Sequence, residues 1–148
     1  MKNAIVILAL SLFCFGLSAA VIVEPVTYVK TGDQVYFGQD LKMGLFNYKV
    51  IDADGVVTKI RNRDVVAYTH NSRHYESLPV ICKTSDTLCF AMMEYVTQKS
   101  GLNLYRYANY EDGEARFEFF VFKNGEFYLR IDQENAKTTL PFFGIKVV

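Results

Sequence analysis

The sequence has no tryptophan, only three prolines and three cysteines, and no excess of charge of either sign. Its 16 Lys and Arg residues balance 16 Asp and Glu residues, which argues against nucleic-acid binding because such surfaces carry a marked basic excess. It also lacks a Gly-x-Ser-x-Gly nucleophile elbow and a Gly-rich nucleotide loop. We therefore expect a protein that is not an enzyme, with no catalytic residues, no cofactor and no nucleic-acid partner.

The long apolar run of the sequence lies at the N-terminus. Lys2 precedes an uncharged stretch that ends in the small residues Ser18-Ala19-Ala20, which is typical of a secretory signal peptide. The alternative is an uncleaved anchor over Ala4–Val23, which would just span a bilayer. We favour a signal peptide over residues 1–20 and a single β-rich domain over residues 21–148, without a membrane span. We expect this domain in the periplasm or secreted, with association with the outer membrane as an alternative.

Removal of the signal peptide would leave two cysteines, Cys82 and Cys89. In an oxidising compartment, an isolated pair this close in sequence is typically joined. A redox-active pair would instead have the spacing Cys-x-x-Cys and a lowered thiol pKa. We therefore expect a structural disulfide, which would stabilise the fold by roughly 2–3 kcal/mol through closure of a short loop.

Turn dipeptides recur between runs of aromatic and β-branched residues. Clear examples are Asp54-Gly55, Asp112-Gly113 and Asn124-Gly125. Tight hairpin turns need a positive φ at both central residues, which these residue types tolerate best. The pattern predicts a mainly β fold, an antiparallel meander that forms a small barrel or a strongly curved sheet.

Two segments are harder to assign from the sequence. Residues 85–99 fit either one short helix, for which Met, Ala and Glu are suitable, or a strand, and the surrounding meander favours the strand. Residues 142–147 fit a last strand, with Pro141 at its start or at a sheet edge because proline has no N–H for the ladder.

Two short patterns suggest metal sites but fit better as turns. His70 and His74 have a spacing that binds metal on a helix, yet the residues between them, Asn71-Ser72-Arg73, indicate a hairpin turn. Asp52-Ala53-Asp54-Gly55 begins like a calcium loop, but the ligands required further along the loop are missing. We expect no metal site.

Glu118 and the neighbouring glutamates could supply a pair of carboxylates for acid–base chemistry on a glycoside. We expect them instead to form the solvated face of a hairpin.

Aromatic residues are concentrated in residues 105–128. One interpretation is a strand buried on both faces by an opposite wall or a covering segment. The other is an exposed aromatic surface that stacks on sugars or accepts a partner. The residues predicted to form such a surface are Tyr105, Arg106, Tyr107, Tyr110, Phe120 and Phe122.

Two parts of the sequence form a recognisable pattern: Lys59–Tyr68 with His74–Val80, and Phe90 with Gly101 and Leu102–Tyr107. This pattern resembles small exported proteins of Bacteroidetes-type bacteria. The resemblance implies a periplasmic or outer-membrane-associated β domain, and it implies no particular activity.

These observations lead to one main hypothesis, a non-catalytic binding or interaction module of the cell envelope. Its partner would be a protein or a glycan, held against the predicted aromatic surface or an open sheet edge. The alternative is a small β-barrel that carries an apolar ligand in its interior. An enzyme is the third hypothesis.

Overall fold

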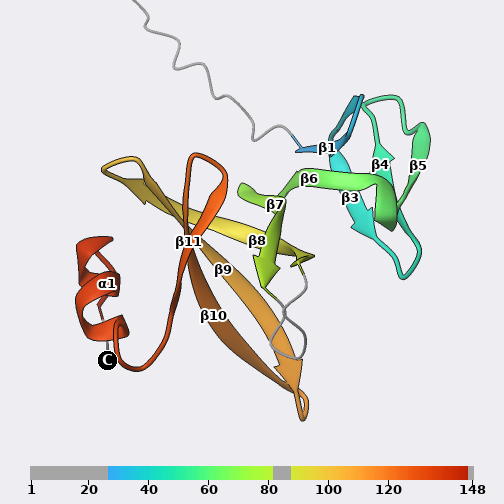
Figure 1. The fold of residues 1–148 in the computed structure, drawn as a ribbon. Helices are drawn as coiled ribbons and strands as arrows, with labels where there is room; N and C mark the ends of the chain where they lie inside the picture. Colours follow the sequence, from blue (N-terminus) through green and yellow to red (C-terminus); the bar gives the residue numbers. More distant parts are fainter. Residues whose placement is uncertain (1–26, 82–87, 147–148) are drawn as a thin grey trace, which may run out of the picture.

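A computed structural model describes residues 27–81 and 88–146 of the chain (Figure 1). The predicted signal peptide and Cys82 lie outside these residues. Within the described ranges no helix is long and apolar enough to cross a membrane. The fold is mainly β, and the described residues form eleven strands, one 3-10 turn and a short C-terminal helix. The elements are β1 (Thr27–Thr31), β2 (Val35–Gly38), β3 (Asp40–Met43), β4 (Asn47–Ile51), β5 (Val57–Arg61), η1 (Asn62–Asp64), β6 (Val65–His70), β7 (Arg73–Ile81), β8 (Leu88–Lys99), β9 (Leu102–Glu111), β10 (Glu114–Lys123), β11 (Glu126–Ile131) and α1 (Ala136–Phe142).

The strands form two antiparallel sheets. The larger sheet has eight strands in the order β11-β10-β9-β8-β7-β6-β1-β2, and the smaller sheet has the order β3-β4-β5. The predicted antiparallel meander is confirmed, but the prediction of a barrel or strongly curved sheet is wrong, because the sheets are neither closed nor strongly curled. Closure would require the outer strands β2 and β11 to pair. Instead, β2 is only four residues long and the chain leaves it to build the smaller sheet.

Two of the three predicted Asx-Gly turns have the backbone conformation expected from the sequence, whereas at Asp54-Gly55 only the glycine has positive φ. Asn124 and Gly125 both have positive φ, and so do Asp112 and Gly113. The pair Asn71-Ser72 adopts the same left-handed region, at the hairpin between β6 and β7. These turns connect consecutive strands of the larger sheet, so local turn chemistry accounts for most of the meander.

The segment over residues 88–99 is a strand, as the surrounding meander suggested. β8 pairs with β7 on one side and with β9 on the other. Ladders on both sides and burial on the sheet outweigh the helical preference of its Met, Ala and Glu residues.

The C-terminal segment corrects another prediction. Residues 136–142 form α1, and Pro141 lies inside this helix rather than at the start of a strand. The helix follows a turn in which Oδ1 of Asp132 accepts hydrogen bonds from the backbone N–H groups of Glu134 and Asn135. Apolar side chains of the segment, Leu140 and Phe143 among them, then pack on the sheet, so tertiary burial determines the conformation of this short piece.

Three hydrophobic clusters hold the molecule together. The first lies between the smaller sheet and strands β1 and β6, around Val29, Leu41, Val50, Ile60, Val65 and Tyr68. The other two lie on opposite faces of β7–β11. Helix α1 and the residues after it cover one face, around Leu104, Val121, Ile131 and Phe143. The other face carries Leu78, Val80, Met93, Tyr105, Phe120 and Phe122. Burial on both faces therefore explains Phe119, Phe120 and Phe122 of β10, whereas Phe117 is half-exposed.

Candidate functional site

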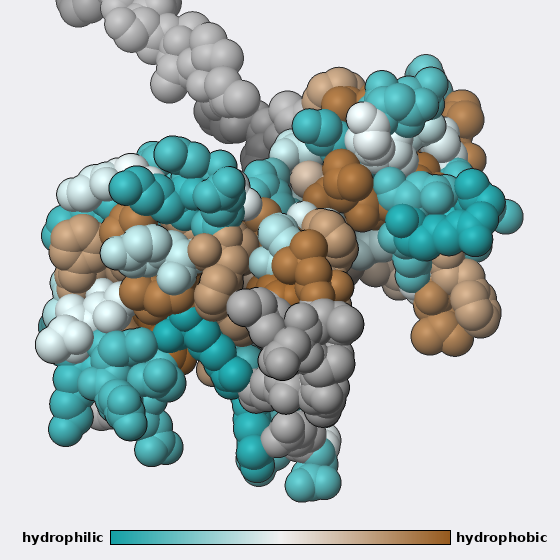
Figure 2. Space-filling model, viewed as in Figure 1, coloured by the Kyte–Doolittle hydropathy of each residue, from teal (hydrophilic) through white to brown (hydrophobic). Residues whose placement is uncertain are grey.

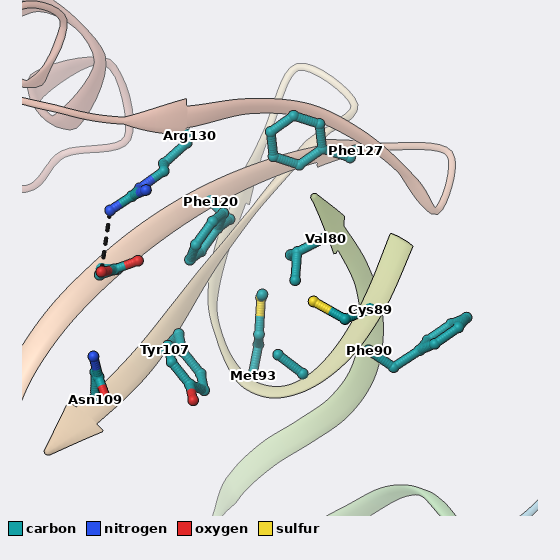
Figure 3. A pocket seen from close by; sticks show the side chains of 11 residues that line it. Val80, Cys89, Phe90, Met93, Tyr107, Asn109, Phe120, Phe127 and Arg130 are labelled. Carbon is teal, nitrogen blue, oxygen red and sulfur yellow. Dashed lines mark ion pairs between the residues drawn. The ribbon is translucent and has the colours of Figure 1, made fainter. Parts of the chain in front are cut away.

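A cavity of about 440 Å³ opens on the face of β7–β11 that α1 does not cover (Figure 3). Side chains of five strands border it, because alternate residues of each strand project from the same side of a sheet. The apolar lining consists of Val80, Cys89, Phe90, Ala91, Met93, Phe120 and Phe127, and the more polar lining of Tyr107, Asn109, Glu118 and Arg130.

The apolar part of the cavity rests on the hydrophobic core. Met93 is fully buried and Val80 and Phe120 are nearly so, so these side chains form a fixed base. Ala91 and Cys89 lie on the same face of β8 as Met93 and are much smaller than their aromatic neighbours. Their small size leaves a hollow beside Phe120 and Phe127, whose ring centres lie 6.5 Å apart. Phe90 is exposed and points away from the cavity at its edge (Figure 3).

The polar part of the cavity is organised by an ion pair. Nη2 of Arg130 lies 3.0 Å from Oε1 of Glu118, and the guanidinium carbon is 5.9 Å from the centre of the Phe120 ring. Both charged side chains are partly exposed, so the pair contributes at most about 1 kcal/mol to stability. Tyr107 and Asn109 approach from β9, which places four hydrogen-bonding side chains around one end of an apolar hollow.

The predicted aromatic surface does not exist as one exposed patch. Tyr105, Phe120 and Phe122 are core residues with 5%, 7% and 0% of their surface exposed. Tyr107 and Phe120 border the cavity, whereas Arg106 and Tyr110 border a separate hollow that includes Phe117, Glu94 and Tyr75. Which of these side chains are neighbours on one face of the sheet depends on the pairing register of β8, β9 and β10. The sequence does not give this register.

Arg106 has a structural role on its face of the sheet. Its Nη2 donates a hydrogen bond of 2.7 Å to Oε2 of Glu94, and its guanidinium carbon lies 4.6 Å from the centre of the Phe117 ring. Nε of Arg73 is 3.8 Å from the other oxygen of Glu94. Arg106 therefore links β9 to β8 and β10.

A chain of polar contacts connects β1 to β9 beside the second cluster. The Tyr28 hydroxyl lies 3.0 Å from Nδ1 of His74, and Nε2 of His74 lies 2.7 Å from Oε1 of Glu76. The hydroxyl of Tyr105 donates a hydrogen bond of 2.7 Å to Oε2 of the same carboxylate. His74, which the sequence suggested as a metal ligand, is thus engaged with Glu76 and Tyr28, and no group of three potential ligands able to hold a metal ion occurs among the described residues.

The environment of Glu76 favours the ionised carboxylate. Burial disfavours the charge, but hydrogen bonds from His74 and Tyr105 and the positive charges of His74 and Lys30 outweigh it and lower the pKa of Glu76 below its usual value. Burial raises the pKa of Tyr105 above its ordinary value, and its hydrogen bond to Glu76 raises it further. The phenol therefore stays protonated and acts as a donor to the carboxylate.

Cys89 borders the cavity, while its predicted partner Cys82 lies outside the described residues. The disulfide therefore stays a prediction. Sequence reasoning did not identify several residues of the cavity, because nothing in their local pattern distinguishes them from ordinary strand residues. They are Val80, Met93, Asn109, Phe127 and Arg130.

Comparisons of the chain with family models, with curated proteins and with solved structures gave no match.

Proposed function

We propose that the chain is an exported, non-catalytic binding module of the cell envelope that holds a small amphipathic ligand in the cavity bordered by β7–β11. The observation that carries this proposal is a hollow of about 440 Å³ with an apolar base and four polar side chains at one end. Ligand pockets typically combine this range of volume with mainly apolar walls and a few placed polar groups.

The arrangement specifies the chemistry of the ligand. An aliphatic or aromatic portion would lie against Met93, beside the Phe120 and Phe127 rings, which contact each other. A polar end would exchange hydrogen bonds with Arg130, Glu118 or Asn109. This proposal keeps the ligand-carrying alternative of the sequence analysis but moves the ligand from a barrel interior to the open face of a sheet. It is favoured over docking of a partner on an aromatic surface, because half of the residues predicted for that surface, Tyr105, Phe120 and Phe122, are core residues.

Native mass spectrometry of the protein, isolated gently from its own host, tests the proposal. We expect a reproducible adduct of a few hundred daltons, since this mass range suits a cavity of this size. The Ala91→Phe variant, which fills the cavity, should lose the adduct. The matched control is Ala115→Phe, which adds the same group at an exposed position of β10 outside the cavity and should keep it.

A second variant examines the polar end. Arg130→Met removes the guanidinium and its ion pair with Glu118, and it should lower adduct occupancy while changing the free energy of unfolding by no more than about 1 kcal/mol. Arg116→Met, on the same sheet outside the cavity, is the control. A bare protein in the wild-type spectrum, or an adduct that Ala91→Phe does not affect, would contradict the proposed site.

A further inference from the structure

The smaller sheet has an unusual distribution of charge on its outer face. Lys42, Lys49 and Lys59 are direct neighbours across the three strands, since Lys42 pairs with Lys49 and Lys49 with Lys59. All three are exposed, and within the described residues none of them makes an ion pair. Like charges directly opposite one another destabilise a sheet. A row of three lysines is therefore a cost to the fold that a bound anion would offset.

An apolar tip lies at one end of the same sheet. The turn between β3 and β4 carries Leu45 and Phe46, with 84% and 75% of their surface exposed, and Met43 beside them is half-exposed. Figure 2 shows this tip as a hydrophobic projection at the free end of the β3–β4 hairpin, next to a hydrophilic surface over β4 and β5. Packing among the described residues does not cover this projection.

The tip is held in shape by Asn62 of η1. Its Nδ2 donates hydrogen bonds to the carbonyl oxygens of Gly44 and Leu45, at 3.1 and 2.9 Å, and its backbone N–H donates to the carbonyl of Phe46 at 3.1 Å. The N–H of Gly44 in turn donates to the carbonyl of Asn47. Moving a backbone carbonyl out of water without a hydrogen bond costs free energy, and these bonds satisfy the carbonyls of Gly44, Leu45 and Phe46.

The charges are ordered along the sheet. Arg61 and Arg63 lie at the tip end, where Asp64 pairs with both of them at the exposed surface. Three other acidic residues of this part of the chain, Asp40, Asp52 and Asp54, lie at the opposite end, at the start of β3 and in the β4–β5 turn. Asp33 borders a hollow beside Lys59 but makes no ion pair with it. The tip end of the sheet is therefore the basic end.

We propose that this end of the smaller sheet docks on a bilayer that contains anionic phospholipid, with Leu45 and Phe46 inserted at the interface and Lys42, Lys49 and Lys59 at the headgroup phosphates. Lys42 is three residues from Leu45, which corresponds to roughly 10 Å along a strand. Interfacial segments bury apolar side chains about 5–10 Å deep, so the flexible lysine side chains reach the phosphates above the inserted tip. This surface is separate from the cavity and does not depend on the ligand proposed there.

Vesicle flotation of the full chain, as its host processes it, tests the proposal. The protein should float with vesicles of phosphatidylglycerol and phosphatidylethanolamine, should not float with phosphatidylcholine alone, and should dissociate as salt is raised. The variant K42Q/K49Q/K59Q should bind on the order of 100-fold more weakly, from about 1 kcal/mol per basic residue. Its control, K123Q/K137Q/K146Q, removes the same charge from exposed positions elsewhere and should bind like wild type.

The tip is tested by its own pair of variants. L45S/F46S should bind at least about 100-fold more weakly, because two apolar side chains no longer leave water. Val56→Ser, at the exposed β4–β5 turn on the opposite end of the sheet, is the control and should have no effect. All these positions are exposed, so the variants should keep the wild-type circular dichroism. The unfolding midpoint should not fall, and K42Q/K49Q/K59Q should raise it slightly because it removes the repulsion between the three lysines.

A gain-of-signal measurement complements these losses. Because the chain has no tryptophan, Phe46→Trp introduces a single indole, whose emission should shift to the blue on addition of the anionic vesicles. Val56→Trp should show no shift. Absence of vesicle binding, or binding that L45S/F46S leaves unchanged, would overturn the proposal. Lysine-dependent binding of a soluble polyanion such as heparin, with no dependence on Leu45 and Phe46, would assign the lysine row to a different partner and overturn it as well.

Discussion

The hydroxyl of Tyr105 on β9 donates a hydrogen bond of 2.7 Å to Oε2 of Glu76 on β7, above the strand β8 that separates them. The contact therefore joins strands that do not pair. It also closes the polar chain that runs from Tyr28 on β1 through His74 to Glu76. This chain links the part of the larger sheet that packs on the smaller sheet with the part that forms the cavity.

Removal of this hydroxyl should destabilise the protein. Tyr105→Phe keeps the buried ring and deletes the donor to an ionised carboxylate, and we expect a loss of about 1–2 kcal/mol in the free energy of unfolding, since Glu76 is only partly buried. Urea unfolding followed by circular dichroism measures this change. Tyr128→Phe, at an exposed position of β11, should change the free energy by less than about 0.5 kcal/mol. Equal effects of the two substitutions would show that the contact contributes nothing specific.

The contribution of Glu76 should depend on pH in a defined direction. Its pKa is lower in the folded state than the ordinary value of 4.5, so its carboxylate stabilises the fold above that value and the contribution is lost as pH falls through the folded pKa. The difference in free energy of unfolding between wild type and Glu76→Gln should therefore be larger at pH 7 than near pH 3. Glu126→Gln, at an exposed turn, is the control and should differ little from wild type at either pH. A difference for Glu76→Gln that grows on acidification would have the wrong sign.

The passage from β2 to the smaller sheet should tolerate no side chain at Gly38. A Cβ atom there would lie 2.6 Å from the carbonyl oxygen of Ile51 and 2.6 Å from Cγ1 of Val50. Gly38→Ala should lower the free energy of unfolding by roughly 1–3 kcal/mol, the usual range for overpacking. At Gly32 a Cβ would meet no atom within 4 Å, so Gly32→Ala should be nearly neutral. Thermal unfolding of the two variants distinguishes a steric requirement at Gly38 from a general intolerance of alanine in this region.

The segment after the last strand should contribute substantially to stability through Phe143. This side chain is only 8% exposed and packs on the face around Leu104, Val121 and Ile131. Phe143→Ala should cost about 3–5 kcal/mol, the range found for buried phenylalanines. The adjacent Phe142 is 38% exposed, with Nζ of Lys99 4.9 Å from its ring centre, and Phe142→Ala should cost much less. If the two variants unfolded at the same denaturant concentration, the covering role of this segment would be contradicted.

The predictions from sequence were correct where a conformation depends on neighbouring residues, and wrong where it depends on contacts distant in sequence. The turns at Asp112-Gly113 and Asn124-Gly125 were predicted because their positive φ values depend on the residues themselves. The strand over residues 88–99 was predicted only with help from its neighbours, since its composition also suits a helix. The segment around Pro141 was predicted wrongly, because its conformation depends on the sheet face that it covers.

The candidate site was less accessible to sequence reasoning for the same reason. Tyr107 and Phe120 were singled out as aromatic residues, but their neighbours Met93, Asn109 and Arg130 come from three different strands. Their proximity depends on the register of each ladder, and a shift of one residue would turn every side chain to the other face.

Turn residues and strand patterns, which act over a few neighbouring positions, are therefore sufficient to specify the antiparallel hairpins. Long-range packing is responsible for the open edge of the larger sheet, for the cover that α1 provides on one of its faces and for the cavity on the other. It also brought Lys42, Lys49 and Lys59 into one row beside the tip of Leu45 and Phe46. These features arise from the packing of segments distant in sequence, where burial and cross-strand register outweigh local preference.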